Sequence, residues 1–179
     1  MKIIKIFIGS SIFEFEKERL DIYIFLCSLE NVLNLSIEPF ICELHDTNVN
    51  GRKQNEYNEN IKDSSLSFFI FGKKAGMYTL EELKFAQKSF EDNGNPEVTV
   101  FLENFDGDEP IDSSITNLND FLKEQKISTV NFENINTVKY HILNRILRQT
   151  NFKAEIIDNK IIVNNSIIRR IKVSEIENI

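Results

Sequence analysis

The sequence predicts an α/β fold: a doubly wound, mostly parallel five-stranded sheet with a C-terminal β-hairpin appendage. Short, β-branched apolar runs alternate about five times with longer amphipathic stretches, which is the pattern of a parallel sheet covered by helices on both faces. The run at 65–71 is almost wholly apolar toward its end, as in a strand that is buried on both sides. The chain has 179 residues, enough for one such domain and a small addition.

Residues 1–150 carry the alternating pattern and are the expected α/β domain. Strands are expected where short apolar runs are bounded by glycine or polar residues, at 3–8, 36–42, 65–71, 97–102 and 127–132. Helices are expected where apolar side chains recur every three or four residues, at 14–33, 52–63, 79–92, 114–125 and 135–149. The first helix carries its apolar stripe on Phe15, Ile22, Leu26, Leu29 and Leu33.

Residues 151–179 change character and are expected to form the appendage or the start of a linker. Two apolar runs flank Asp158-Asn159-Lys160, which predicts a hairpin, and Asn164-Asn165-Ser166 predicts a second turn. An isolated hairpin is marginal in water. We therefore expect the tail to pack on the domain edge or to lead into a further domain.

Charge and hydropathy exclude some classes of partner. The net charge is -7 and the pI about 5.0, so a nucleic-acid partner is not expected. The one basic cluster, Arg169-Arg170-Ile171-Lys172, is too short to form a binding surface for nucleic acid. No stretch approaches the roughly 20 apolar residues that span a bilayer, and the N-terminus does not resemble a signal peptide. A cytoplasmic protein without membrane contact is expected.

The cysteines and histidines are isolated in the sequence. Cys27 and Cys42 form no C-x-x-C pair and are expected to be reduced structural thiols. His45 and His141 belong to no cluster with metal-ligand spacing. Neither a metal nor a bound cofactor is expected.

Ligands of open parallel sheets bind beyond the carboxyl ends of the strands. The segments expected there are Gly9-Ser10-Ser11, 43–51, 72–78 and 103–105. Gly9-Ser10-Ser11 could hold a phosphate or a ribose hydroxyl through backbone N–H groups and hydroxyls. Alternatively, Ser11 caps the following helix, with Glu14 completing a capping box. Neither G-x-G-x-x-G nor a P-loop occurs in the chain.

The helix of the third strand–helix unit, expected at 79–92, contains the main candidate, Glu82. Thr79 is expected to cap this helix, and Glu82 stands three residues later, so the pair also fits a chemically silent capping box. Glu81 is expected to be only a helix-start carboxylate. Gly76 and Tyr78 precede the helix and are candidate binding residues.

Several motifs, taken in order, resemble a bacterial branch of the TIR-like (Toll/interleukin-1 receptor homology) domains over about residues 3–150. They are Phe7-Ile8-Gly9-Ser10-Ser11, Glu18-Arg19, Gln54-x-x-Tyr57-Asn58-x-x-Ile61 and Gly76-x-Tyr78-Thr79-x-Glu81-Glu82-x-x-x-Ala86. The spacing of Glu82 and Ala86 is also similar to the catalytic helix of nucleoside 2-deoxyribosyltransferases. The chain departs from the W-C-x-x-E-L pattern of many TIR domains, because it contains no tryptophan.

The resemblance implies a TIR-like, flavodoxin-like fold and cleavage of NAD, with Glu82 as the catalytic carboxylate and NAD as substrate rather than cofactor. It implies binding roles for the glycines, hydroxyls and amides of the motifs: Gly9, Ser10, Ser11, Gln54, Tyr57, Asn58, Gly76, Tyr78 and Thr79. It further implies an effector in bacterial defence or signalling that self-associates and has a fused or partner signalling domain.

The chemistry of a single carboxylate leaves alternatives open. Nicotinamide departs from NAD as a neutral pyridine and needs no general acid, so one carboxylate that stabilises the oxocarbenium-like transition state suffices. The alternatives are a non-catalytic interaction module and a nucleoside or nucleotide N-glycosidase or deoxyribosyltransferase, for which the sequence offers no clear second acid. Gln54, Tyr57 and Asn58 could equally form a solvated helix face. Arg19 could bind a phosphate or pair with Glu16 or Asp21.

Overall fold

The structure is a computed structural model that describes residues 3–11, 14–41, 44, 54–104 and 112–177. One sheet is formed by β1 (Ile3–Ser10), β2 (Ser36–Phe40), β3 (Leu66–Phe71), β4 (Glu97–Glu103) and β5 (Ser128–Phe132). The helices of this part are α1 (Glu16–Leu33), α3 (Gln54–Asp63), α4 (Met77–Asn93), α5 (Ser113–Glu124) and α6 (Ile135–Arg148). The tail forms β6 (Ala154–Ile157), β7 (Lys160–Val163), β8 (Ser166–Ile168) and the short 3-10 helix η1 (Val173–Glu175).

The sheet has the order β2-β1-β3-β4-β5, and its neighbouring strands are parallel. The chain leaves β1 toward β2 at one edge and then crosses to β3 on the other side of β1. The expected doubly wound α/β fold is therefore confirmed. The strand predicted to be buried on both sides, β3, lies at the centre of the sheet, and all six of its residues are buried.

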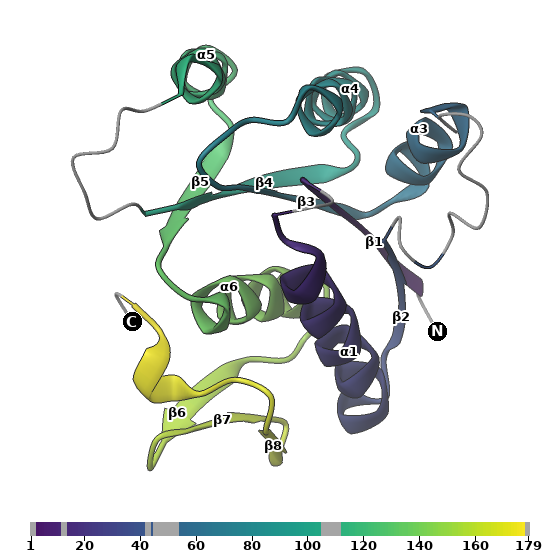
Figure 1. Cartoon of the computed structure of the whole chain (residues 1–179). Coiled ribbons are helices and arrows are strands. Elements are labelled where there is room, and N and C mark those ends of the chain that lie inside the picture. The colour runs from purple at the N-terminus through teal and green to yellow at the C-terminus, as the bar shows by residue number, and fades with distance from the viewer. Residues whose placement is uncertain (1–2, 12–13, 42–43, 45–53, 105–111, 178–179) are drawn as a thin grey trace.

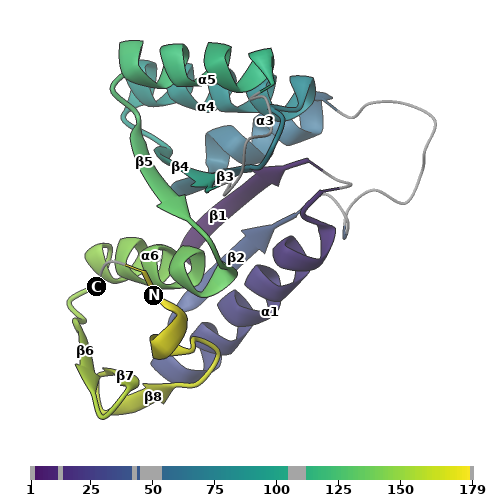
Figure 2. The same ribbon diagram turned by 60° about the vertical axis from the view of Figure 1, so that its left-hand side comes forward.

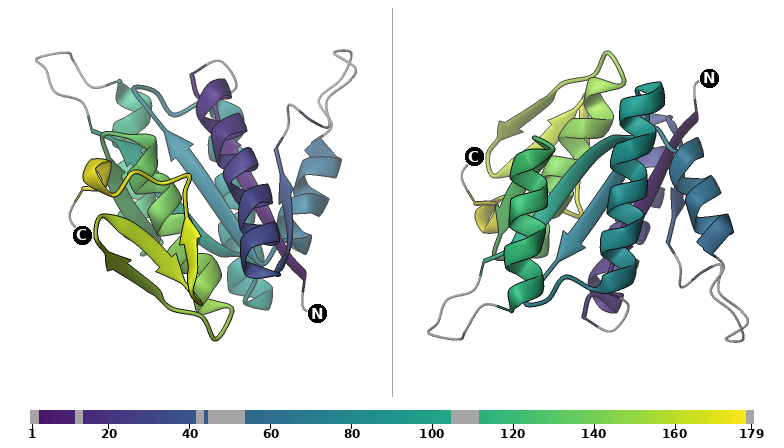
Figure 3. Two further views of the ribbon diagram at one scale, coloured as in Figure 1. Left: turned by 90° about the horizontal axis from the view of Figure 1, so that it is seen from below. Right: turned by 90° about the horizontal axis from the view of Figure 1, so that it is seen from above.

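Helices cover both faces of the sheet (Figure 1). Helices α3, α4 and α5 lie side by side on one face, whereas α1 and α6 lie on the other (Figure 3). Alternate residues of β3 supply the two cores: Phe68 and Ile70 pack toward α1 and α6, and Phe69 and Phe71 toward α3, α4 and α5. The stripe predicted for α1, from Phe15 to Leu33, is buried.

The tail forms a three-stranded antiparallel sheet with the order β6-β7-β8. Both turns lie where the sequence predicts them, and each has two residues with positive φ, Asp158-Asn159 and Asn164-Asn165, as a type I′ turn requires. The small sheet packs against α1 and α6 (Figure 2), and the inward side chain of Ile161 belongs to the same apolar core as those helices.

Several element boundaries differ from the expectations by one or more residues, and the following differences affect the candidate site. Strand β1 continues to Ser10, so Gly9 and Ser10 belong to a strand and not to a loop. Helix α1 begins at Glu16 rather than at residue 14, and α4 begins at Met77 rather than at residue 79. Among the described residues, no helix is long and apolar enough to cross a bilayer.

We predict that Asp21→Asn lowers the free energy of unfolding by about 1–3 kcal/mol, because it removes the partner of a buried ammonium group. Lys139 of α6 is buried, pairs with Asp21 of α1 and also reaches the Arg170 carbonyl at 3.5 Å. The matched control is Asp63→Asn. Asp63 Oδ2 lies 3.8 Å from Lys5 Nζ, and both side chains are exposed. It should cost less than about 0.5 kcal/mol in the same urea titration. Equal effects of the two changes would contradict a role for Lys139 in joining the helices and the tail.

Candidate functional site

The topological switch point of the sheet lies between β1 and β3. The chain leaves these neighbouring strands toward opposite edges of the sheet, and their carboxyl ends lie together because Ser10 is in register with Ile70. In open α/β sheets this is the place where ligands bind. Of the segments expected at this edge, residues 43, 45–51 and 105 lie outside the described residues, and so do Cys42 and His45.

Glu82 lies in the second turn of α4, on the face of the helix that packs on the sheet. Gly76 is the N-cap residue and makes no side-chain capping bond, so the capping box predicted for Thr79 and Glu82 is wrong. Glu82 is only 8% exposed and shares its buried face with Thr79, Leu83 and Ala86. Glu82 is thus an ionisable side chain on a buried helix face, in a position that the capping of α4 does not explain.

The side of α4 that carries Glu82 faces α3. Residues three and seven positions after Glu82 lie on the same side of the helix. These two residues, Phe85 and Ser89, line a cavity of about 260 Å³ together with Lys62 of α3. On the other side of α4, Lys84 lies 5.7 Å from the ring of Phe121 in α5. Glu82 therefore lies on the side of α4 that faces α3.

Two of the predicted binding residues of α3 border the same side of the sheet. Tyr57 is half-buried, and its ring meets that of Phe40 edge-on at 5.9 Å, while Phe40 stacks on Phe7 at 5.6 Å. Asn58 follows Tyr57 and is also half-buried. The Gln54 backbone begins α3, but its side chain lies outside the described residues.

Gly9 and Ser10 point to opposite faces of the sheet. A Cβ on Gly9 would lie 2.8 Å from the Phe69 ring, on the α4 side, so that only glycine fits there. The Ser10 hydroxyl lies on the α1 side, where it accepts a hydrogen bond from Arg19. The predicted binding residues are therefore divided between the two faces, because successive residues of a strand alternate.

Arg19 holds the end of β1 from the α1 side. Its side chain is fully buried and also donates to the Ser11 carbonyl at 2.7 Å. Asp21, one of the partners considered for it, pairs with Lys139 instead. The capping box expected for Ser11 and Glu14 is wrong, because α1 begins after Phe15 and the Glu14 carboxylate turns away from the helix.

The loop from β3 to α4 is attached on both sides. The Lys73 N–H donates to Glu14 Oε1 at 3.0 Å, and the Ala75 N–H donates to Ser114 Oγ of α5 at 3.0 Å. At Gly72, an added Cβ would lie 2.1 Å from Glu14 Oε1 and 2.9 Å from the Phe15 ring. Gly72 thus lets the carboxylate approach the loop, and the two bonds fix where α4 begins.

Asp112 supports the second of these attachments. It is the N-cap residue of α5 and accepts from both the hydroxyl and the backbone N–H of Ser114, at 2.6 and 2.9 Å. These bonds, the hydroxyl's first, hold the pKa of Asp112 below its usual value. Because the Ser114 hydroxyl donates to Asp112, its lone pairs are oriented to accept from Ala75.

Three residues at the start of α4 were expected to bind ligand. Gly76 is not required by its surroundings, because an added Cβ would meet only Thr79 Oγ1, at the ordinary contact distance of 3.6 Å. Tyr78 is exposed at the start of α4, whereas Thr79 is buried below it. Tyr78 is therefore accessible to solvent, whereas Thr79 shares the buried face of α4 with Glu82.

Glu103, at the end of β4, belongs to the segment 103–105 that was expected at this edge, but no role was predicted for it. Glu103 lies two residues after Phe101, which is buried in the core formed with α1 and α6. Residues two apart in a strand face the same side of the sheet, so Glu103 lies on the α1 side. Burial, and then the nearby carboxylates of Glu14 and Glu18, raise the pKa of Glu103, and Lys73 opposes this rise. Its position directly after a predicted strand is the one sequence signal that could have identified it.

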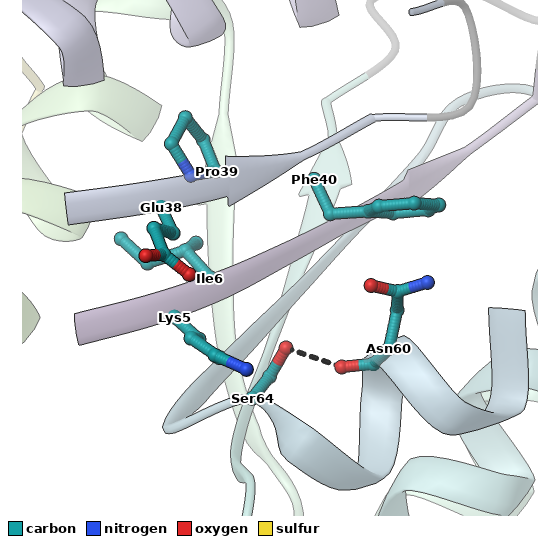
Figure 4. Close-up of a pocket in the computed structure, with 7 residues that line it drawn as sticks. All are labelled: Lys5, Ile6, Glu38, Pro39, Phe40, Asn60 and Ser64. Carbon is teal, nitrogen blue, oxygen red and sulfur yellow. Dashed lines mark hydrogen bonds between the residues drawn. The ribbon is translucent and has the colours of Figure 1, made fainter. Parts of the chain in front are cut away.

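A small cavity beside β2 and the acidic, cysteine and histidine side chains were considered as alternative sites. A cavity of about 160 Å³ opens beside the edge strand β2, where Ser64 Oγ donates to the Asn60 carbonyl at 2.7 Å (Figure 4). It is smaller than the roughly 300 Å³ at which small-molecule sites begin, and its Lys5 and Glu38 lie in the middle of their strands. Among the described residues, no group of three or more His, Cys, Asp or Glu side chains could hold a metal ion.

Comparison with known proteins supports the fold. No family model matches the chain, and no curated protein matches it. Among solved structures, the chain is similar to the CMP N-glycosidase BcmB of Clostridium botulinum, with 13% sequence identity and a TM-score of 0.50. The match covers 78% of this chain and 98% of the glycosidase. At this identity the likeness shows the α/β fold alone, and it does not support a TIR-like family in particular.

We predict that Gly72→Ala lowers the free energy of unfolding by about 1–3 kcal/mol, because the methyl group displaces the Glu14 carboxylate and presses on the buried Phe15 ring. Gly76→Ala is the matched control in the same loop and should cost less than about 1 kcal/mol, since its added Cβ has room. Chemical denaturation measures both. Glu14→Ala removes the carboxylate that accepts from the Lys73 N–H, so hydrogen exchange at the Lys73 amide should become faster. Unchanged exchange would contradict the hydrogen bond between Glu14 and Lys73.

We predict that Glu103→Gln stabilises the protein at neutral pH but not at acidic pH. A carboxyl whose pKa is raised in the folded state binds more protons there than in the unfolded state, so the stability of the protein falls as the pH rises from about 4.5 through the folded pKa. The uncharged amide of Glu103→Gln does not titrate, so this fall in stability with rising pH is absent from the variant. Urea unfolding of both proteins across the acidic to neutral range measures the effect, and a variant that is less stable at neutral pH would contradict it.

Proposed function

We propose that the chain hydrolyses the N-glycosidic bond of a nucleotide and that Glu82 is the carboxylate that acts on the ribose. The observation that carries this proposal is the burial of Glu82 on the sheet-facing side of α4, beside the switch point. A buried ionisable group in the position where α/β sheets bind their ligands is a candidate for catalysis. The fold shared with a CMP N-glycosidase is consistent with this class of reaction.

The proposed reaction breaks the bond between C1′ of the ribose and the base nitrogen. The bonding electrons leave with the base, and positive charge develops on C1′ and the ring oxygen. A carboxylate in a site of low dielectric stabilises that charge more strongly than water does. Water then adds to C1′ and loses a proton. Tyr57 and Asn58 border the same side of the sheet and are the proposed contacts for the nucleotide.

The position of Glu103 favours a second candidate substrate, NAD. A neutral base needs a proton as it leaves, and the carboxyl with a raised pKa, Glu103, lies on the α1 side of the sheet, across from Glu82. Nicotinamide is bound to NAD as a pyridinium and departs without a proton. Cleavage of a cytidine nucleotide would therefore draw its proton from water, whereas NAD would need none.

We predict that Glu82→Gln lowers base release by roughly a hundredfold or more, because the amide is nearly isosteric with the carboxylate but carries no charge. Purified protein at high concentration, which allows for the expected self-association, is incubated separately with CMP and with NAD. Chromatography quantifies cytosine and nicotinamide. Glu81→Gln is the matched control, because Glu81 is exposed on the same turn of α4.

The outcomes separate the candidate functions. Release of cytosine by the wild type and by Glu81→Gln supports the nucleotide N-glycosidase, and release of nicotinamide alone supports the NAD-cleaving alternative. Base release that persists in Glu82→Gln would refute the assignment of Glu82. No release from either substrate by the wild type would favour a non-catalytic interaction module.

A further inference from the structure

A groove opens at the end of the small C-terminal sheet, away from the candidate catalytic edge. Its walls are the end of the turn before β7, the residues at and after the end of β8, and the segment 171–174. Its volume of about 490 Å³ lies within the range of roughly 300–1,000 Å³ that is typical of small-molecule sites. The residues that line the groove include Arg169, Ile171 and Lys172 of the short basic cluster at 169–172.

Two cations from neighbouring parts of the small sheet line this groove. Ile161 of β7 pairs with Ile168 of β8 in the antiparallel ladder. Lys160 at the start of β7 and Arg169 directly after β8 are the residues next to this pair, and both line the groove. Like charges that share a small groove repel each other. Lys172, from the segment that follows, adds a third cation. No carboxylate is among the described residues that line the groove, although the chain as a whole is acidic.

The backbone that carries these cations is held in place. The Lys172 N–H donates to Asn136 Oδ1 at 3.1 Å, and the Arg170 carbonyl accepts from the buried Lys139. Ile171 and Val173 belong to the core that α1 and α6 form. The cations are thus presented from a fixed frame, which reduces the entropy that binding an anion would cost.

One interaction competes with an anion in this groove. Lys172 Nζ pairs with Glu175 at 3.0 Å, and both side chains are exposed. Exposed ion pairs of this kind are weak, so a phosphate with two charges can replace the carboxylate. Arg169 and Lys160 form no salt bridge that the structure describes, and an anion between them would offset their repulsion.

We propose that this groove binds the phosphate group of a small phosphate ester. The Arg169 guanidinium offers the planar fork that suits phosphate oxygens, and the two lysines supply further charge. Ile167 is exposed beside them and Ile171 lines the wall, so the groove also contacts an apolar part of the ligand. The inference is independent of the glycosidase proposal, because the groove shares no residue with the edge that carries Glu82.

The test is a titration of the full chain with inorganic phosphate and with phenyl phosphate, followed by amide chemical shifts. Shifts are expected at 159–160 and 167–174, with tighter binding of phenyl phosphate because its ring contacts the isoleucines. The double variant Lys160→Gln, Arg169→Gln should weaken binding about tenfold or more. Lys153→Gln, an exposed lysine outside the groove, is the matched control and should bind as the wild type does.

A second variant tests the electrostatic argument without relying on binding alone. Lys160→Glu replaces one of the groove's cations by a carboxylate, so it should abolish phosphate binding without lowering Tm. The proposal is overturned if the double variant binds as tightly as the wild type, if the shifts map elsewhere, or if Lys160→Glu lowers Tm. Binding of a single-stranded oligonucleotide without binding of either phosphate probe would also overturn it in favour of a nucleic-acid surface.

Discussion

The hydrogen bonds that hold the loop between β3 and α4 are the constraint on which the candidate site depends. This loop starts at the end of the central strand and sets where α4 begins, and hence which side of the helix carries Glu82. Glu14 holds the loop from the α1 side through the Lys73 N–H, and Ser114 holds it from α5 through the Ala75 N–H. Because the two bonds come from opposite layers, the start of α4 is fixed relative to the whole sheet.

The same edge of the sheet has two chemically different sides. On the α1 side, the buried Arg19 holds the end of β1, and the pKa of Glu103 is raised by burial and by neighbouring carboxylates. On the other side, Glu82 lies on the buried face of α4, and the ring of Tyr57 in α3 meets that of Phe40 in β2. We infer that the α1 side supports the edge and that the α3–α4 side receives the nucleotide.

Much of the fold could be predicted from the sequence, because it depends on local patterns. The apolar run that became β3 and the paired polar residues that became type I′ turns are signals confined to a few neighbouring residues. The candidate site was less predictable. Glu14 and Lys73 are 59 positions apart, and nothing in either local sequence indicates their contact. The first strand was expected to end at residue 8, whereas β1 continues to Ser10. The alternation of side chains that places Gly9 and Ser10 on opposite faces of the sheet was therefore not predicted.

The most direct test of this account is a crystal structure of the Glu82→Gln variant with bound CMP, and with NAD as a second ligand. The account predicts that C1′ of the ribose lies in contact with the side chain at position 82, on the α3–α4 side of the switch point. A nucleotide bound on the α1 side, beside Arg19 and Glu103, or bound away from the carboxyl edge of the sheet, would contradict the account.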